Sequence, residues 1–155
     1  MTPAVDQLTS AGVAFETVAY DHDPDADSYG DEAAAKLGLD PDEVFKTLMA
    51  EVGNELVVAI VPTSARLDLK ALARAAGTKK ATMADPGDAE RSTGYVVGGM
   101  SPFGQHQSRA TYLDETALAF DEINVSGGRR GLELRLAPDD LVAVLDAVVA
   151  PIAAF

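Results

Sequence analysis

The middle of the chain contains two strand-like runs that are separated by a short turn. Residues 47–52 and 56–61 are rich in apolar and β-branched side chains, and Gly53-Asn54 lies between them. Two such runs around a glycine-containing turn predict a β-hairpin. We therefore expect a fold built on a sheet that includes this hairpin, with Lys46 at its mouth.

The segments on either side carry the signals of further helices and strands. Capping residues, early prolines and terminal glycines predict helices at residues 3–11, 29–37, 69–76 and 138–148, a short helix from Pro86 and a helical turn near 116–120. Alternating or β-branched runs predict strands at residues 15–20, 80–83, 95–97, 111–113, 123–125 and 132–136. We expect Val148 on the buried side of the last helix.

This mixture of elements bounds the fold class. Short strands mixed with helices, without strict alternation, indicate an α/β or α+β domain around a mixed sheet. The chain of 155 residues is about one domain long, so we expect a single domain over residues 1–155.

The composition excludes several kinds of chemistry. The chain has no cysteine, which excludes disulfides, thiolate metal sites and a protein cysteine nucleophile. His22 and His106 stand in separate polar loops without a third ligand at metal spacing, so we expect no metal and no cofactor. The sequence shows no signal peptide and no membrane-spanning run, so we expect a cytoplasmic protein.

The charge distribution leaves two interpretations of the surface open. The formal net charge is −13, which argues against a nucleic-acid partner because phosphate contacts rely on Lys and Arg. The segment with the glycine turns nevertheless contains Lys79-Lys80, Arg91, Arg109 and Arg129-Arg130. These cations predict one locally basic face, and the alternative is a solvated acidic surface that keeps the protein soluble.

Two glycine turns are candidates for ligand contacts. Gly98-Gly99 is followed by Ser101-Pro102, and Ser126-Gly127-Gly128 precedes Arg129-Arg130. Glycine tolerates positive φ and lets backbone N–H groups approach a phosphate, a carboxylate or a carbonyl oxygen. The spacing matches neither a P-loop nor a dinucleotide fingerprint. An ordinary tight turn is the alternative for the first of them.

Three side chains are candidates beside these turns. Lys46 lies within an apolar run, so its ammonium must reach solvent or hold an anionic group. Tyr20 ends a strand, where its hydroxyl could bind a ligand or close the rim of the core. Glu133 begins a strand, where its carboxylate could bind an amine or a ribose hydroxyl, or pair with an arginine. Neither Ser101 nor Ser126 lies in a nucleophile motif.

Ten motifs occur in order over nearly the whole chain. They are Met1-Thr2-Pro3-Ala4-Val5, Tyr20-Asp21-His22-Asp23-Pro24, Tyr29-Gly30-Asp31-Glu32, Lys36-Leu37-Gly38-Leu39, Phe45-Lys46-Thr47-Leu48, Leu67-Asp68-Leu69-Lys70, Met83-Ala84-Asp85-Pro86, Arg91-Ser92-Thr93-Gly94-Tyr95, Gly98-Gly99-Met100-Ser101-Pro102 and Val125-Ser126-Gly127-Gly128-Arg129-Arg130-Gly131-Leu132. Together they resemble the YbaK/EbsC family of aminoacyl-tRNA deacylases, which are free-standing relatives of the editing domain of bacterial prolyl-tRNA synthetases. Within that family the sequence is most similar to the Cys-tRNA(Pro) deacylase branch.

The resemblance implies a compact domain with a mixed, partly barrel-like sheet flanked by helices. It also implies a trans-editing deacylase that hydrolyses mischarged Cys-tRNA(Pro), with the substrate thiol as nucleophile. Aminoacyl-tRNA is then the partner, and prolyl-tRNA synthetase is a candidate second partner. The alternatives are deacylation of Ala-tRNA(Pro) or another small mischarged aminoacyl-tRNA, and a non-catalytic module that binds aminoacyl-tRNA or a synthetase.

The same resemblance implies the site residues. Catalytic roles are expected for Lys46, Gly98 and Gly99. Substrate-binding roles are expected for Tyr20, Tyr29, Thr47, Ser101, Ser126, Gly127, Gly128 and Glu133. Close relatives have aspartate at the position of Glu133, so this chain keeps the charge on a longer side chain.

Overall fold

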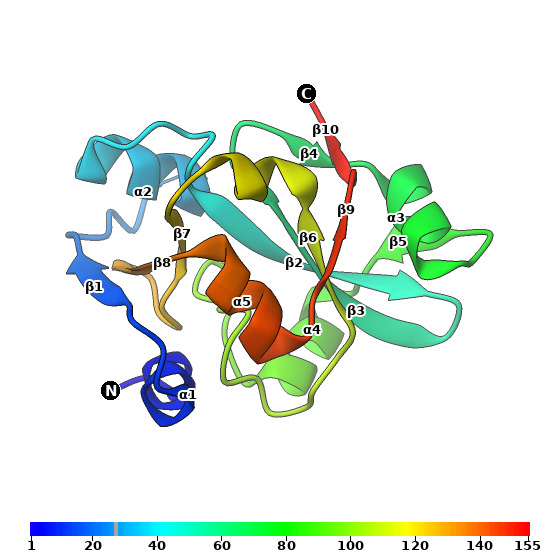
Figure 1. The fold of residues 1–155 in the computed structure, drawn as a ribbon, viewed down its shortest axis with the longest axis horizontal. Helices are drawn as coiled ribbons and strands as arrows, with labels where there is room; N and C mark the ends of the chain where they lie inside the picture. Colours follow the sequence, from blue (N-terminus) through cyan, green and yellow to red (C-terminus); the bar gives the residue numbers. More distant parts are fainter. Residues whose placement is uncertain (27) are drawn as a thin grey trace.

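The predicted hairpin is present and lies in the largest sheet. In the computed structural model, which describes residues 1–26 and 28–155, β2 (Phe45–Val52) pairs antiparallel with β3 (Glu55–Pro62) over its whole length. β5 (Ala81–Met83) pairs with the end of β2, while β6 (Thr111–Asp114) and β9 (Val148–Ala150) continue the sheet beyond β3 in parallel. The strand order is β5-β2-β3-β6-β9 (Figure 1).

A smaller antiparallel sheet adjoins the start of β2. It consists of β1 (Glu16–Ala19), β8 (Leu132–Leu136) and β7 (Ile123–Ser126), in the order β1-β8-β7. A parallel bridge between Val44 and Asn124 connects β7 to the large sheet. β4 (Arg66–Leu67) and β10 (Ala153–Ala154) form a separate short pair. The structure therefore confirms the mixed sheet of an α/β domain.

Helices begin and end at the residues that the capping signals predict. α1 (Pro3–Ala11), α2 (Tyr29–Leu37), α3 (Leu69–Ala76) and α4 (Pro86–Thr93) each follow a side chain that accepts a hydrogen bond from the first turn, and each ends at a left-handed glycine. η1 (Glu115–Ala119) and α5 (Pro138–Leu145) complete the helical elements. None of the described helices has the length and apolar character that a membrane crossing requires.

The two faces of the hairpin belong to two hydrophobic clusters. Val58 and Ile60 of β3 pack in one cluster with residues of α1, β7, β8 and α5, whereas Val57, Ala59 and Val61 pack in the other with α3. A strand that is buried on both faces needs a continuous apolar run. The hairpin is thus at the centre of the molecule. The small sheet and α2 lie at one end of β2, and α3 with β5 lies at the other end (Figure 1).

Two sequence predictions of secondary structure are wrong. Residues 95–97 form no strand, because α4 continues to Thr93 and the Tyr95 side chain is buried, with its hydroxyl donating to the Phe103 carbonyl at 2.7 Å. The last helix ends at Leu145, since Asp146 adopts a left-handed φ of 50°. Val148 consequently begins β9 and is 48% exposed, where burial on a helix was expected.

Candidate functional site

A cavity of about 370 Å³ lies where the start of β2 meets α2, the glycine turn after α4 and the small sheet. Seven of the residues with an expected site role line it. They are Lys46, Gly98, Tyr20, Tyr29, Thr47, Ser126 and Glu133. Segments that are far apart in the sequence therefore bring most of the predicted site together around one cavity.

The other four predicted residues lie outside the cavity lining. Gly99 packs against the second glycine turn, where an added Cβ would lie 3.1 Å from Arg129 Cα, and its N–H already donates to the Val96 carbonyl at 3.0 Å. Ser101 is fully buried, and its hydroxyl accepts from the Phe103 N–H at 3.2 Å. These contacts stabilise the first glycine turn from outside the cavity lining.

Gly127 and Gly128 shape the second turn in a similar way. The Gly127 N–H donates to the Leu132 carbonyl at 2.8 Å. Gly128 has a φ of 105°, and an added Cβ would lie 2.9 Å from the Tyr95 ring. Glycine is therefore required at position 128 by both conformation and space.

Lys46 is half-buried in the wall of the cavity. Burial lowers the pKa of its ammonium group, and the nearby carboxylate of Asp31 opposes that shift only in part. Among the described residues, Lys46 forms no ion pair within 4.0 Å. A partly dehydrated ammonium that forms no direct ion pair with the described residues is suited to an anionic ligand group.

Glu133 and Tyr20 provide hydrogen-bonding groups in the same cavity. Glu133 is 5% exposed, and burial raises its pKa to about 8. The side chain is therefore mainly a neutral carboxylic acid at pH 7 and can donate a hydrogen bond as well as accept one. Burial also raises the pKa of the Tyr20 hydroxyl, as does the neighbouring Glu133, so this group stays protonated.

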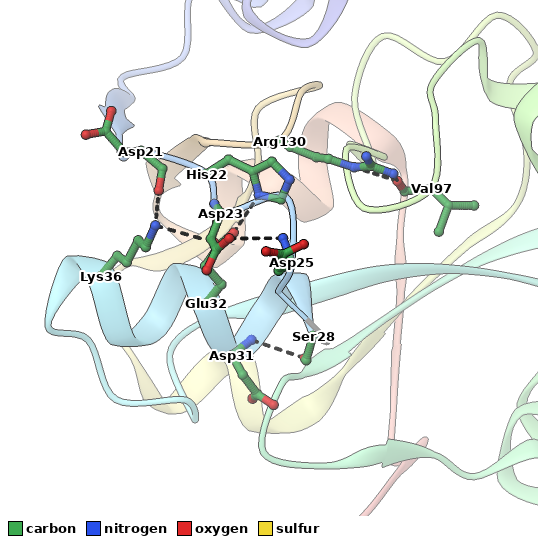
Figure 2. Close-up of polar contacts among 10 residues, drawn as sticks. All are labelled: Asp21, His22, Asp23, Asp25, Ser28, Asp31, Glu32, Lys36, Val97 and Arg130. Carbon is green, nitrogen blue, oxygen red and sulfur yellow. Dashed lines mark hydrogen bonds and ion pairs between the residues drawn. The ribbon is translucent and has the colours of Figure 1, made fainter.

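Tyr29 and Gly98 form a wall of the cavity in direct contact. Gly98 has a φ of 86°, and a Cβ there would lie 2.5 Å from the Tyr29 ring. The guanidinium of Arg130 lies over the Tyr29 ring. It donates from Nε and Nη2 to the Val97 carbonyl at 3.1 and 2.6 Å (Figure 2). One arginine of the second glycine turn thus holds the first glycine turn in place.

A buried carboxylate anchors the segment that leads to Tyr29. Glu32 Oε1 lies 2.7 Å from His22 Nδ1, and Oε2 accepts from the Asp23 N–H at 2.6 Å (Figure 2). Lys36 Nζ lies 3.4 Å from Glu32 Oε2 and also donates to the Asp21 carbonyl. Burial opposes ionisation of Glu32, but the bonds from His22 and its other partners outweigh burial and lower the pKa.

Sequence reasoning missed part of the cavity and its support. Arg129, which was expected on a basic face, also lines the cavity. Apolar residues from several segments complete the lining, among them Met83, Ala84, Pro86, Ala89 and Met100. The only local signal for the Glu32 anchor was the four-residue spacing from Glu32 to Lys36, which suits an ion pair on a helix.

Comparisons with known proteins identify the family of this chain. The sequence pattern of the aminoacyl-tRNA editing domain matches residues 23–144. EbsC of Enterococcus faecalis, which is assigned as a Cys-tRNA(Pro)/Cys-tRNA(Cys) deacylase, is 41% identical over 124 residues, which cover 79% of this chain and 75% of EbsC.

Two solved structures share the fold. One protein, assigned as a trans-editing enzyme for prolyl-tRNA synthetase, is 24% identical with a TM-score of 0.81, over 100% of this chain and 99% of its own. A hypothetical protein, also 24% identical, has a TM-score of 0.88 over 98% of this chain and 99% of its own. Because the family pattern covers most of the chain, and because a relative at 41% identity spans more than three quarters of it, the protein belongs to the aminoacyl-tRNA editing domain family.

Proposed function

We propose that this aminoacyl-tRNA deacylase edits in trans and hydrolyses Cys-tRNA(Pro), with the thiol of the mischarged cysteine as the nucleophile. The observation that carries the proposal is the content of the cavity. It combines a lysine, a neutral carboxylic acid and a glycine turn, while the chain has no cysteine. No histidine is among the described residues that line the cavity, so the serine–histidine pair of a serine hydrolase is not formed by Ser126 there.

The reaction balances with the substrate's own groups. The cysteine Sγ attacks the aminoacyl carbonyl carbon, and the ester bond to the ribose oxygen breaks. The thiol proton is taken up by the departing ribose oxygen, with or without relay through the protein. Water then opens the cyclic thioester and releases free cysteine. The protein supports these steps by positioning and electrostatics and contributes no covalent nucleophile.

Each cavity residue has a role in this proposal. Lys46 holds the terminal ribose-phosphate, because its ammonium is cationic and forms no ion pair within 4.0 Å among the described residues. Gly98 contributes its backbone to the cavity, and its N–H stabilises the oxyanion. Tyr20 and Glu133 hydrogen-bond the aminoacyl group and the ribose, and Tyr29, Thr47 and Ser126 shape the remaining contacts.

The assigned activities of relatives support the choice of substrate. EbsC is assigned as a Cys-tRNA(Pro)/Cys-tRNA(Cys) deacylase, and one structural relative as a trans-editing enzyme for prolyl-tRNA synthetase. We propose prolyl-tRNA synthetase as a second partner that supplies tRNA(Pro) selectivity.

A direct assay tests this function. Purified protein is incubated with Cys-tRNA(Pro) and Cys-tRNA(Cys), each with and without prolyl-tRNA synthetase. We expect hydrolysis of both esters by the protein alone and a preference for Cys-tRNA(Pro) when the synthetase is present. Stable Cys-tRNA(Pro) in the presence of folded protein would contradict the deacylase proposal, and an unchanged preference would contradict the partnership.

A further inference from the structure

Part of the edge of β2 faces the cavity without a pairing strand. β5 pairs with β2 only at residues 50–52, and the bridge from β7 is at Val44, directly before β2. All five residues between these points, 45–49, line the cavity. Since successive side chains of a strand point to opposite faces, a cavity lined by five consecutive residues wraps around the strand edge. The backbone of β2 is therefore itself part of the cavity wall.

Hydrogen bonds at the two ends of this stretch show which backbone groups face the cavity. The Glu43 carbonyl accepts from the Asn124 N–H at 2.9 Å, and the Met49 carbonyl accepts from the Ala84 N–H at 3.1 Å. Both carbonyls thus point away from β3. In a strand, the N–H and the carbonyl of a residue point to the same side, and that side alternates along the chain. Thr47 is an even number of residues from both Glu43 and Met49, so both of its backbone groups point to the open edge.

Thr47 combines an unpaired strand edge with a side-chain hydroxyl that has no partner in the described residues. Among the residues that the structure describes, no strand pairs with Thr47 on the open edge of β2. The Thr47 hydroxyl oxygen is buried and likewise has no hydrogen-bond partner in the described part of the chain. Buried polar groups are nearly always satisfied because an unmade hydrogen bond is costly. A buried hydroxyl without a partner, on a cavity-lining residue of an unpaired strand edge, indicates a ligand that supplies hydrogen-bond partners.

We infer that the α-aminoacyl group of the substrate binds as a one-residue strand opposite Thr47. In an antiparallel hydrogen-bonded pair, two facing residues exchange both N–H···O=C bonds. The aminoacyl carbonyl accepts from the Thr47 N–H, and the α-amino group donates to the Thr47 carbonyl. The ligand class that fits is an ester of an α-amino acid with a free α-amino group. This inference rests on the proposed function and adds the atoms that recognise the aminoacyl group.

The antiparallel direction agrees with the proposed role of Lys46. A partner antiparallel to β2 runs from the side of Met49 toward the side of Lys46, so its carboxyl end, which carries the ribose, points toward Lys46. Lys46 and Arg129 both line the cavity. Thr47 reads only the backbone atoms of the aminoacyl group, which all mischarged amino acids share. Selection among amino acids must then come from the side-chain chemistry of the substrate and not from this pairing.

Hydrogen exchange in the free protein provides the first test. The amides of Lys46 and Leu48 point toward β3 in the antiparallel pair, so they should exchange slowly, and the Thr47 amide should exchange at least tenfold faster. Protein labelled with ¹⁵N resolves these neighbouring amides in one experiment. A Thr47 amide as protected as those of Lys46 and Leu48 would overturn the inference, because its N–H would already have a partner.

Two non-hydrolysable ligands provide the second test. One is adenosine with an L-cysteinyl group joined through a 3′-amide, and the matched control has a 3-mercaptopropionyl group, which lacks only the α-amino group. We expect the cysteinyl ligand to shift the Thr47 amide downfield and slow its exchange, and we expect the control to bind about tenfold more weakly.

These experiments distinguish failure of the inference about Thr47 from failure of the proposed function. Equal affinities of the two ligands, absence of binding by both, or binding that leaves the Thr47 amide unchanged would overturn the pairing at Thr47. Each of these results is compatible with hydrolysis of Cys-tRNA(Pro) by the same protein sample. Absence of that hydrolysis would contradict the proposed function by itself.

Discussion

The guanidinium carbon of Arg130 lies 4.6 Å from the centroid of the Tyr29 ring. The same guanidinium donates two hydrogen bonds to the Val97 carbonyl, so Arg130 joins the second glycine turn to the first and to the start of α2. Gly98 directly follows Val97 and lines the cavity. The position of the proposed oxyanion donor therefore depends on a residue that lies outside the cavity lining.

We expect Arg130→Gln to lower kcat/KM for deacylation by about tenfold. The variant loses a cation–π contact of about 0.5–1 kcal/mol and charge-assisted hydrogen bonds of about 1.5–3 kcal/mol, only part of which acts on the position of the turn. Most of the loss should appear in kcat, because the turn acts on the transition state. Arg74→Gln, at an exposed position on α3, is the matched control. Wild-type kinetics of Arg130→Gln would show that the turn does not need this clamp.

Lys46→Ala should abolish deacylation and leave the fold intact. Lys46 lies at the cavity and is only half-buried, so its removal deletes the proposed ribose-phosphate contact and little of the core. Activity and thermal unfolding are measured for this variant and for Lys70→Ala, which changes an exposed lysine of α3. Turnover near that of the wild type by folded Lys46→Ala would remove Lys46 from the site.

Glu133→Gln should change how stability depends on pH. The folded protein holds the Glu133 proton up to a pKa of about 8, whereas the ordinary value is 4.5. Between these values the unfolded chain binds fewer protons, so the wild type loses stability as pH rises from about 4.5 to about 8, by up to about 1.4 kcal/mol per pH unit. Glutamine does not ionise and escapes this loss.

Denaturant unfolding from pH 5 to pH 9 measures the effect at Glu133. The free energy of unfolding of Glu133→Gln relative to the wild type should increase across this range and level off above about pH 8. Glu55→Gln, at an exposed position on β3, should show no such trend. A constant difference between Glu133→Gln and the wild type would mean that Glu133 is ionised in the folded protein at neutral pH.

Binding of tRNA should be weak and steeply salt-dependent, because few cations act against a net charge of −13. Four of the predicted basic residues form two groups. Arg129 and Arg130 follow the second glycine turn at the main cavity, and Lys79 with Lys80 lines a second cavity of about 320 Å³ at the other end of β2. Charge reversal at either pair should raise the KM for tRNA and reduce its salt dependence, with the larger effect at Arg129 and Arg130. Unchanged KM and salt slope in both double variants would place the tRNA on another surface.

Local signals explain why much of the fold could be predicted. The turn at Gly53-Asn54 and the pairs of capping residue and terminal glycine, such as Asp68 with Gly77, act within a few residues of chain. The wrong predictions depend on distant partners. The loop at Tyr95 is held by the Phe103 carbonyl, and the apolar run at Val148 becomes a strand because β6 offers a parallel edge.

The candidate site shows the same division. Lys46 was noticeable from its own position in an apolar run, and Tyr20 and Glu133 were recognisable beside strand ends and by family resemblance. The unpaired strand edge at Thr47 could not be predicted from the sequence, because it depends on where β5 and β7 stop pairing beside β2. The clamp from Arg130 to Tyr29 likewise needs two segments that are about a hundred residues apart in the sequence.

The identity of the nucleophile is the central claim, and the side chain of the substrate tests it most directly. Attack within one bound molecule can recover on the order of 7–11 kcal/mol of barrier. Cysteine has a thiol of usable acidity, serine has a hydroxyl that is much harder to ionise, and alanine has no nucleophile.

The decisive measurement is single-turnover deacylation of Cys-, Ser- and Ala-tRNA(Pro) by the same preparation, with the wild type and Lys46→Ala side by side. The account predicts a rate for the cysteinyl ester far above that of the seryl ester, an alanyl ester close to the uncatalysed background, and loss of the cysteinyl rate in Lys46→Ala. Equal rates for the cysteinyl and alanyl esters would mean that water is the nucleophile and would contradict the account.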